Sequence, residues 1–467
     1  MLHREKYHLW LNDDEIPLTY LPELMPEPER IQTNSKLIKS GDIFIPLRGE
    51  RFDGHSFIAD AMGNGAACFF YEKNKKNEIP PAHISSGIPT KDTLVALQSI
   101  AKGWRLCQKD LTVVSLTGSV GKTTLKEMIQ LILSKSSETL KTEGNFNNEI
   151  GVPLTLTKLT DKHRYAVIEC GARRKGDITF LTNLVCPNIA CLTNIGTAHI
   201  EIFGSLQNLA KGKLEIFTSS PKDCILVGHY DDERIAACMK EMKRKSYGFG
   251  FHKDADVRIV SSNTLKNGGM EILLSFRGES LNVELKLANS AYPHNVAAAS
   301  AVAAASGIPL RDIATSLKDF AGLEGRYSLT KLKNHLLIDD SYNANPQSMA
   351  SGLASLASGF PDRKKIVVLG DMLELGDNGD ESHKSMGLIC SQKVKPELLI
   401  TVGERSLLIE ESAVSDGFPK AKCIHFSNVD NLIEKVEMLK KCGDLFYVKA
   451  SNGINLKKLV QILKTET

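Results

Sequence analysis

The stretch between Leu111 and Thr124 constrains this chain more than any other. It reads Leu-Thr-Val-Val-Ser-Leu-Thr-Gly-Ser-Val-Gly-Lys-Thr-Thr, so an apolar run leads through a short glycine loop into a polar segment near Lys122. This order predicts a buried strand, a tight loop and a helix, the opening unit of a parallel α/β sheet. The free N–H groups at such a helix start form a binding site for phosphate.

Each residue type in this loop suits a nucleotide phosphate. Gly118 and Gly121 let backbone N–H groups approach the phosphate oxygens, and Lys122 neutralises their charge. The Thr123 hydroxyl is a suitable Mg²⁺ ligand. Leu116 stands where the general phosphate-loop pattern has its first glycine, so this is a shorter T-G-x-x-G-K-T variant. The predicted nucleotide loop comprises Thr117, Gly118, Ser119, Val120, Gly121, Lys122, Thr123 and Thr124.

The loop does not by itself define a function. A glycine turn before an ordinary helix is the structural alternative, which leaves the lysine and the paired threonines unexplained. A phosphate loop also fits a GTPase, a kinase, a motor or a ligase equally well. The rest of the chain has to decide among these classes.

The hydrophobic pattern around the loop predicts a doubly wound parallel sheet in the middle of the chain. Apolar runs at 165–170, 188–194 and 224–227 alternate with helical segments. Between Asp256 and Leu287 the period becomes two, with Asn267-Gly268 as a hairpin turn, which predicts an antiparallel ribbon.

The two ends of the chain predict further α/β domains. Short apolar runs with Gly and Asp turns before the loop indicate a small N-terminal α/β domain. After Gly325, four further strand patterns, each followed by a helical pattern, predict a Rossmann-like C-terminal domain. At 467 residues the chain is too long for one core. We therefore expect three domains, at residues 1–108, 109–322 and 323–467.

Composition and charge exclude several classes. The net charge of +3 is too small to predict a nucleic-acid partner without a concentrated basic patch. The ten cysteines lack C-x-x-C spacing and read as reduced thiols of a cytoplasmic protein. The first twenty residues lack the apolar segment of a secretion signal, and no run is long enough to span a membrane.

Three candidate residues follow the central strands. Glu169 ends one strand, where a carboxylate can reach the phosphate loop and ligate Mg²⁺, although a strand-end Glu is often only solvated. His199 follows the next strand, and a lone His is more often structural than a ligand. Lys213 lies in a helical segment that also reads as a surface helix with Lys211 paired to Glu215.

Seven ordered strings together resemble the Mur ligase family, and the likeness runs from about Ile31 to the C-terminus. They are Thr117–Thr124, Gly144-Asn-Phe-Asn-Asn-Glu-Ile-Gly-Val-Pro-Leu-Thr155, Asn194-Ile-Gly-Thr-Ala-His199, His294-Asn295, Gly325-Arg326, Asp339-Asp-Ser-Tyr-Asn-Ala-Asn-Pro346 and Leu369-Gly-Asp-Met-Leu-Glu-Leu-Gly376. The segment from Gly41 to His55 is similar to the nucleotide-sugar domain of the family.

The resemblance implies an ATP-dependent, ADP-forming ligase of cell-wall precursor synthesis that works with Mg²⁺. The S-Y-N-A-N-P string implies UDP-N-acetylmuramoyl-tripeptide and D-alanyl-D-alanine as substrates, and we expect a monomer. By the same resemblance, Lys122, Lys213, His199 and Glu169 are catalytic, and Thr123, Glu169, His199 and a carbamylated Lys213 hold the metal. Asn295, Arg326 and Asp340 match nucleotide positions, and Ser35, Lys36, Asn147, Asn148, Asn343 and Asn345 match substrate positions.

The chain departs from the family at three places. Asn34-Ser-Lys36 replaces D-S-R near the uridine site, and Lys449-Ala-Ser-Asn452 replaces K-G-S-R near the C-terminus. Glu169-Cys-Gly-Ala-Arg-Arg replaces E-M-G-A-N, which keeps the proposed metal ligand and changes its flank. These changes put uridine contacts and dipeptide selectivity in question.

Two other functions stay open from the sequence. One is another ligase on the same scaffold, either an earlier stem-adding enzyme or a folylpolyglutamate synthetase, against which the Tyr342-Asn-Ala-Asn-Pro346 string argues. The other is a nucleotide switch that hydrolyses ATP or GTP without ligation. The absence of a guanine-selective N-K-x-D string weakens its GTPase form.

Overall fold

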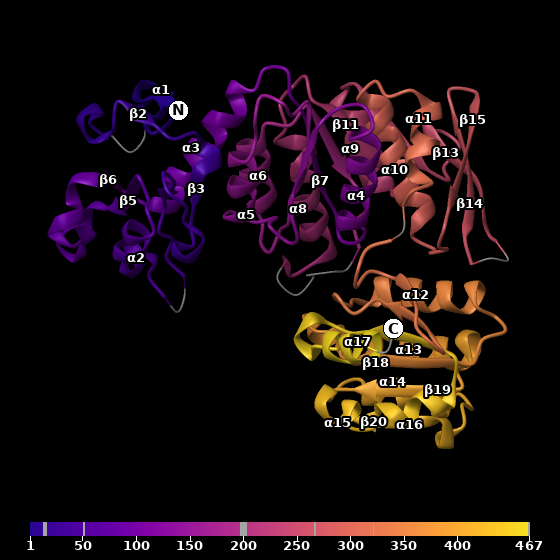
Figure 1. The fold of residues 1–467 in the computed structure, drawn as a ribbon. Coiled ribbons are helices and arrows are strands. Elements are labelled where there is room, and N and C mark those ends of the chain that lie inside the picture. The colour runs from indigo at the N-terminus through magenta and orange to yellow at the C-terminus, as the bar shows by residue number, and fades with distance from the viewer. Residues whose placement is uncertain (13–15, 50–51, 197–202, 266–267, 321, 466–467) are drawn as a thin grey trace.

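The computed structural model describes residues 1–467 except 13–15, 50–51, 197–202, 266–267, 321 and 466–467. The chain forms three α/β units, each built on its own parallel-rich sheet (Figure 1). The N-terminal unit lies beside the central one, and the C-terminal unit lies below the half of the central unit that carries α10 and β13–β15 (Figure 1). The expected fold class is confirmed, while the boundaries at 108/109 and 322/323 stay predictions.

The central unit holds a nine-stranded sheet with the order β15-β14-β13-β12-β11-β10-β7-β9-β8. Its strands are β7 (Thr112–Thr117), β8 (Thr139–Lys141), β9 (Tyr165–Glu169), β10 (Ile189–Leu192), β11 (Ile225–His229), β12 (Ser246–Gly250), β13 (Val257–Thr264), β14 (Met270–Phe276) and β15 (Glu279–Leu285). From β8 to β13 neighbouring strands are parallel, whereas β13, β14 and β15 pair antiparallel. The predicted ribbon therefore extends the main sheet. Asn267 of its predicted turn lies outside the described residues.

Helices cover both faces of this sheet, as the nearly continuous apolar strands require. One face packs against α4 (Lys122–Leu133), α10 (Tyr292–Ala305) and α11 (Leu310–Leu317). The other packs against α3 (Thr93–Cys107), α5 (Gly151–Thr157), α6 (Asp177–Val185), α8 (Leu206–Thr218) and α9 (Glu233–Met242). The carboxyl ends of β7, β9, β10 and β11 consequently meet the start of α4 at one edge, where ligands bind in such sheets.

The C-terminal unit is a six-stranded sheet with the order β16-β17-β21-β18-β19-β20, parallel except for the pair β16–β17. The strands are β16 (Ser328–Lys331), β17 (Leu336–Asp339), β18 (Lys365–Gly370), β19 (Leu398–Val402), β20 (Cys423–Phe426) and β21 (Leu445–Lys449). One face packs against α12 (Pro346–Gly359), α13 (Gly379–Ile389) and α14 (Leu407–Ser415). The other packs against α15 (Val429–Ile433), α16 (Val436–Leu439) and α17 (Lys457–Lys464).

The N-terminal unit is a small parallel sheet that is joined firmly to the central unit. Its strands are β3 (Ile31–Gln32), β4 (Ile43–Phe44), β5 (Cys68–Glu72) and β6 (Gly87–Thr90), with α2 (Ile58–Gly63) against one face. Helix α3 packs on this sheet as well as on the central one. Trp104 of α3 donates its indole N–H to the carbonyl of Leu159 at 2.9 Å, and Arg105 donates to that of Val185 at 3.1 Å.

The residues before Ile31, for which the sequence suggested no function, complete this junction. Strands β1 (Leu2–His3) and β2 (Leu24–Met25) pair antiparallel, and α1 (Arg4–Trp10) packs on α3. The rings of Trp10 and Trp104 lie 6.1 Å apart. No disulfide forms among the ten cysteines, and none of the described helices is long and apolar enough to cross a membrane.

Candidate active site

The phosphate loop is held open by two glycines that accept no side chain. Gly118 and Gly121 have φ of +152° and +84°, backbone conformations that favour glycine. A Cβ on Gly118 would lie 1.8 Å from Oγ1 of Thr193, and one on Gly121 would lie 2.8 Å from Oδ1 of Asn295. The loop thus packs against the end of β10 on one side and against α10 on the other.

Asn194, which follows β10, fastens the loop from behind. Its side-chain amide donates to the carbonyl of Val120 at 2.9 Å, and its Oδ1 accepts the Val120 N–H at 3.0 Å. The hydroxyl of Thr193 donates to the same carbonyl at 2.9 Å. The sequence placed Asn194 in a family string but gave it no role, because a loop buttress needs contacts between distant segments.

Glu169 and Thr123 meet at the edge of the sheet, as expected. The Thr123 hydroxyl donates to Oε2 of Glu169 at 3.0 Å, and the Asn147 amide donates to Oε1 at 2.9 Å. The carboxylate is buried. Lys122 lies nearby, with its Nζ donating to the Gly118 carbonyl at 2.8 Å, and burial lowers the pKa of this lysine. A hydroxyl and a carboxylate beside a lysine are groups that can hold a phosphate and a hard cation.

A second buried lysine lies behind Glu169. Lys126 of α4 is 1% exposed and donates to the carbonyl of Thr142 at 2.6 Å. The Thr142 hydroxyl in turn accepts the backbone N–H of Glu169 at 3.0 Å. Lys126 therefore fixes the segment that positions the carboxylate. Sequence reasoning missed it because a lysine in an amphipathic helix reads as an exposed residue.

Lys213 is buried, so the interpretation of its segment as a simple surface helix is wrong at this position. It lies in α8 with 1% exposure. Burial, together with the charge of Lys122, lowers its pKa to about 7. The predicted pairing partner of Lys211 has another role, because the Glu215 carboxylate accepts the N–H groups of Gly176 and Thr179 at 3.1 and 3.0 Å and caps α6.

The C-terminal unit contributes the opposite wall of the site. The guanidinium of Arg326 lies over the ring of Tyr342, 4.1 Å from its centroid. Asp340 is buried between Nζ of Lys449 at 2.8 Å and the hydroxyl of Tyr447 at 3.1 Å. Burial raises the pKa of Asp340, against the attraction of Lys449. Arg326 carries its positive charge close enough to act on Lys122, so the two units share one electrostatic site.

Two of the asparagines predicted to contact substrate accept N–H groups at helix starts in the structure, and Asn345 is the N-cap of its helix. Oδ1 of Asn148 accepts the Gly151 N–H at 2.9 Å at the start of α5. Oδ1 of Asn345 accepts the Ser348 N–H at 2.8 Å and closes a capping box on α12. Oδ1 of Asn343 accepts the N–H of Ala344 at 2.9 Å. An asparagine before a helix serves equally well as a cap or as a ligand, so the string alone did not separate the two.

Most of the predicted residues line two neighbouring cavities, whereas Ser35, Lys36, Thr117 and Gly118 line neither. The larger, of about 820 Å³, lies between the central and C-terminal units. It is lined by Ser119, Val120, Gly121, Lys122, Thr123, Thr124, Asn147, Glu169, Asn295, Arg326, Asp340, Asn343 and Asn345. The smaller, of about 180 Å³, is lined by Lys122, Asn147, Asn148 and Lys213 together with Arg173 of the altered flank. Lys122 and Asn147 border both cavities. His199 lies outside the described residues.

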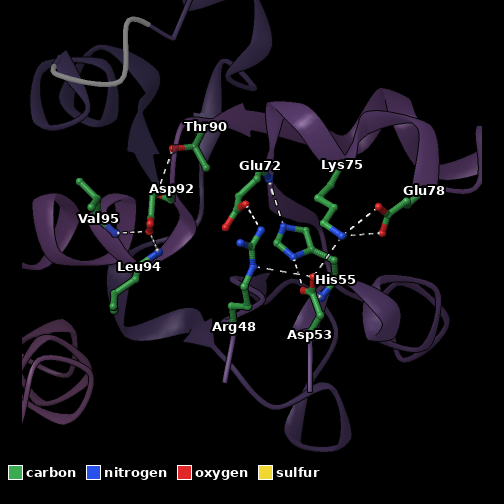
Figure 2. A network of polar contacts seen from close by, with 10 residues as sticks. All are labelled: Arg48, Asp53, His55, Glu72, Lys75, Glu78, Thr90, Asp92, Leu94 and Val95. Carbon is green, nitrogen blue, oxygen red and sulfur yellow. Dashed lines mark hydrogen bonds and ion pairs between the residues drawn. The ribbon is translucent and has the colours of Figure 1, made fainter. Parts of the chain in front are cut away.

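The segment similar to a nucleotide-sugar domain is organised by a buried histidine (Figure 2). Nδ1 of His55 lies 2.6 Å from Oδ1 of Asp53, and its Nε2 accepts the backbone N–H of Glu72 at 3.1 Å. Arg48 pairs with the Glu72 carboxylate, and Nζ of Lys75 lies 3.4 Å from Asp53 (Figure 2). The Nδ1–H tautomer satisfies both contacts. The network ties the segment that follows β4 to the end of β5.

Asp53 makes the stability of this network depend on pH. Burial opposes its ionisation, but hydrogen bonds from the His55 backbone and imidazole outweigh it and lower the Asp53 pKa from 3.8 to about 2. Because the folded pKa lies below the unfolded one, the stabilisation is complete above about pH 4 and is lost as the pH falls towards 2.

We expect Asp53→Asn to reduce local stability by about 1–2 kcal/mol at neutral pH. The local stability of this variant should also fall less steeply as the pH is lowered. Hydrogen exchange of the Glu72 amide between pH 5 and 2 measures this, with Asp60→Asn, which changes an exposed carboxylate of the same unit, as the control. Equal acid sensitivity in Asp53→Asn and the unaltered chain would contradict the assignment.

The Asn34-Ser-Lys36 segment, which stands in place of the family's D-S-R, forms a capped turn. Oδ1 of Asn34 accepts the Lys36 N–H at 3.0 Å and caps a short helical turn, a role that needs an acceptor oxygen and no charge. Ser35 is buried and Lys36 is exposed. Ala450, in place of the family's glycine, lies fully buried beneath Gly370.

Comparison with known proteins defines the class. Family models match three successive segments: the Mur ligase family catalytic domain at residues 28–105, the Mur ligase middle domain at 116–303 and the Mur ligase glutamate ligase domain at 325–452. The chain therefore belongs to the Mur ligase family.

Within that family, several relatives that align over nearly the whole chain share one name. The UDP-N-acetylmuramoyl-tripeptide–D-alanyl-D-alanine ligase of Bacillus subtilis is 35% identical over 443 residues, 93% of this chain and 92% of the relative. Its Escherichia coli counterpart is 33% identical, over 93% and 94% of the two chains. Crystal structure I of MurF from Acinetobacter baumannii superposes with a TM-score of 0.84 at 30% identity, over 99% and 98%. The MurF ligase of Thermotoga maritima in complex with ADP gives 0.80 at 27% identity, over 95% and 99%.

Proposed function

We propose that this chain is the ATP-dependent ligase that joins D-alanyl-D-alanine to UDP-N-acetylmuramoyl-tripeptide through an acyl phosphate. The observation that carries the proposal is the pair of cavities that meet at Lys122 and Asn147. One offers a phosphate loop and the other a buried pocket for the carboxylate to be activated. The name shared by relatives that align over nearly the whole chain supports the same substrates.

ATP lies in the larger cavity under this proposal. The N–H groups at the start of α4 face its phosphates, and Lys122 neutralises their charge. Arg326, carried by the segment that leads into the C-terminal unit, adds a second positive charge from the opposite wall. Asn295, Asp340 and the stacked pair of Arg326 and Tyr342 are the remaining nucleotide contacts. The Thermotoga relative is a complex with ADP, which supports an adenine nucleotide as the ligand.

The donor set suits Mg²⁺. The Thr123 hydroxyl and the Glu169 carboxylate are oxygen ligands 3.0 Å apart, at the buried edge of the phosphate loop. When bound, the ion would neutralise charge that develops on the transferred phosphoryl group. His199 and Lys213 are proposed as its further protein partners. Two further residues orient the Glu169 carboxylate. Asn147 bonds to it directly, and Lys126 acts through the Thr142 segment.

Lys213 can contribute only after its charge is reversed. An ammonium here would repel both Lys122 and the metal. With a pKa of about 7, Lys213 is a free amine in a large fraction of the molecules at neutral pH. That amine attacks carbon dioxide, forming the N–C bond of a carbamate and releasing one proton. The carbamate oxygens then offer the negative charge that the cluster needs.

The reaction needs two attacks in sequence. The terminal carboxylate of the tripeptide attacks the γ-phosphorus in line, and the bond to the β-phosphate oxygen breaks to release ADP. The amine of D-alanyl-D-alanine then attacks the acyl carbon, loses a proton, and expels inorganic phosphate. Water must be excluded between the two steps, which favours closure of the C-terminal unit over the site. Asn343, Asn345 and Asn452 border the larger cavity on that side.

Oxygen transfer tests the acyl phosphate directly. With the tripeptide carboxylate labelled by ¹⁸O, one labelled oxygen is expected in the released phosphate, because the carboxylate oxygen that attacks phosphorus leaves with it. Amide formation with unlabelled phosphate would overturn this route. Hydrolysis of ATP without either substrate would favour a nucleotide switch.

Lys126→Met tests how Glu169 is positioned. We expect turnover to fall by about 10- to 100-fold and the Mg²⁺ concentration for half-maximal rate to rise, because the Thr142 segment loses its anchor. Lys365→Met is the matched control, since Lys365 is also buried and donates to backbone carbonyls, at 3.3 Å, but lies in the C-terminal unit. An unchanged Mg²⁺ requirement in Lys126→Met would show that Lys126 only supports the fold.

We propose that the N-terminal unit binds the uridine nucleotide through Ser35 and Lys36. Asn147 and Asn148 of the central unit are assigned to the muramoyl peptide. The assigned chemistry uses cytoplasmic precursors, so we place the protein in the cytoplasm. We propose that it acts as a monomer, because both walls of the larger cavity come from one chain.

A further inference from the structure

Three side chains outside the proposed Mg²⁺ site converge in the central unit. His229 ends β11, Asp231 follows in the next turn, and His294 lies in the first turn of α10. One oxygen of Asp231, Oδ2, lies 3.2 Å from Nε2 of His229 and 3.1 Å from Nε2 of His294. Their ligand atoms lie within 4.8 Å of one another. The mechanism above uses none of these three side chains.

The backbone holds the carboxylate in place. Asp231 accepts the N–H of Phe251 at 2.9 Å and that of His252 at 2.6 Å. Gly250, with φ of +137°, permits this approach, because a Cβ there would lie 2.7 Å from the carboxylate oxygens. The His229 ring stacks on Phe249 with centroids 5.3 Å apart. Two of the three ligands are thus fixed before any ion binds.

We propose that His229, Asp231 and His294 bind a divalent transition metal of the Zn²⁺ class. Ligand atoms at 2.0–2.1 Å from a tetrahedral zinc are separated by about 3.3 Å, close to the two separations observed. Two imidazoles and one carboxylate suit Zn²⁺ and not Mg²⁺, which prefers oxygen ligands. The site is therefore chemically distinct from that of Thr123 and Glu169.

The position of the cluster gives the metal a consequence. His229 and His294 both line the larger cavity, and Asn295, assigned to the nucleotide, is the neighbour of His294. The His294 side chain is 33% exposed, so water or a ligand group in the cavity can reach the cluster. A bound metal and a bound nucleotide would thus occupy the same cavity, and any coupling between their affinities would be reciprocal.

Zinc binding to the full chain tests the proposal. We expect the unaltered protein to bind about one Zn²⁺ in competition with a chromophoric chelator, and His294→Gln and Asp231→Asn to weaken that binding at least about 10-fold. His252→Gln is the matched control. Its imidazole is exposed, accepts the Asp254 N–H at 3.2 Å and lies edge-on to the Tyr230 ring, while its backbone contact to Asp231 remains. Circular dichroism verifies that each variant is folded.

Cobalt identifies the ligands. Co²⁺ bound at the cluster is expected to show the absorption of nitrogen and oxygen ligands and to lose it in His294→Gln. Three results would overturn the proposal: no binding by the unaltered chain, equal binding by all four proteins, or thiolate-to-cobalt absorption, which would place the metal on cysteines. None of these depends on the ligase reaction, so failure here leaves the proposed function untouched.

Discussion

Lys213→Ala is expected to reduce ligase turnover by at least about 1000-fold, because no neutral or cationic side chain replaces the charge of a carbamate beside the transferred phosphate. The affinity for ADP without Mg²⁺ should change little, since under the proposal the phosphates contact the loop and Lys213 acts through the metal. Lys211→Ala is the matched control, because Lys211 lies two residues away on the same helix and is exposed. Steady-state phosphate release and ADP titration measure the two quantities.

Small carboxylates separate a lost anion from a damaged fold. Formate or acetate fits the space left by a lysine side chain and supplies anionic oxygens, so either should restore part of the turnover of Lys213→Ala and none of that of Glu169→Ala. Wild-type-like turnover in Lys213→Ala would exclude the carbamate.

Gly118→Ala is expected to weaken nucleotide binding by at least about 100-fold. Its Cβ would lie 1.8 Å from Oγ1 of Thr193, so either the loop or the end of β10 must move. Gly278→Ala controls for backbone strain alone, since Gly278 has φ of +85° with no heavy atom within 4 Å of a built Cβ. Isothermal titration with ADP gives both affinities. Normal affinity in Gly118→Ala would mean that the observed loop conformation is not the one that binds phosphate.

The parts of the fold that the sequence predicted are those with strong local patterns. The phosphate loop and the buried strands β9, β10 and β11 follow from apolar runs and turn residues close together in the chain. The short strands β6, β8 and β16 were missed. They are short, lie at or near sheet edges, and depend on pairing with distant strands rather than on their own composition.

The site was predictable where chemistry and local motif coincide, as at Lys122, Thr123 and Glu169. It was less predictable where a polar side chain has two uses. Asn148 and Asn345 match substrate positions and yet accept N–H groups at the starts of helices. Lys126 and Asn194 support the site through bonds between segments that the sequence does not bring together. The cluster of His229, Asp231 and His294 joins two elements 65 residues apart, so only the structure reveals it.

Phosphate release with purified protein, ATP and Mg²⁺ is the most direct test of the central claim. The assay is run with and without UDP-N-acetylmuramoyl-tripeptide and D-alanyl-D-alanine, and the product mass is measured. We predict release that requires both substrates, with one pentapeptide nucleotide formed per phosphate. Release that is indifferent to both substrates would contradict the ligase assignment and show that the phosphate loop serves a different reaction.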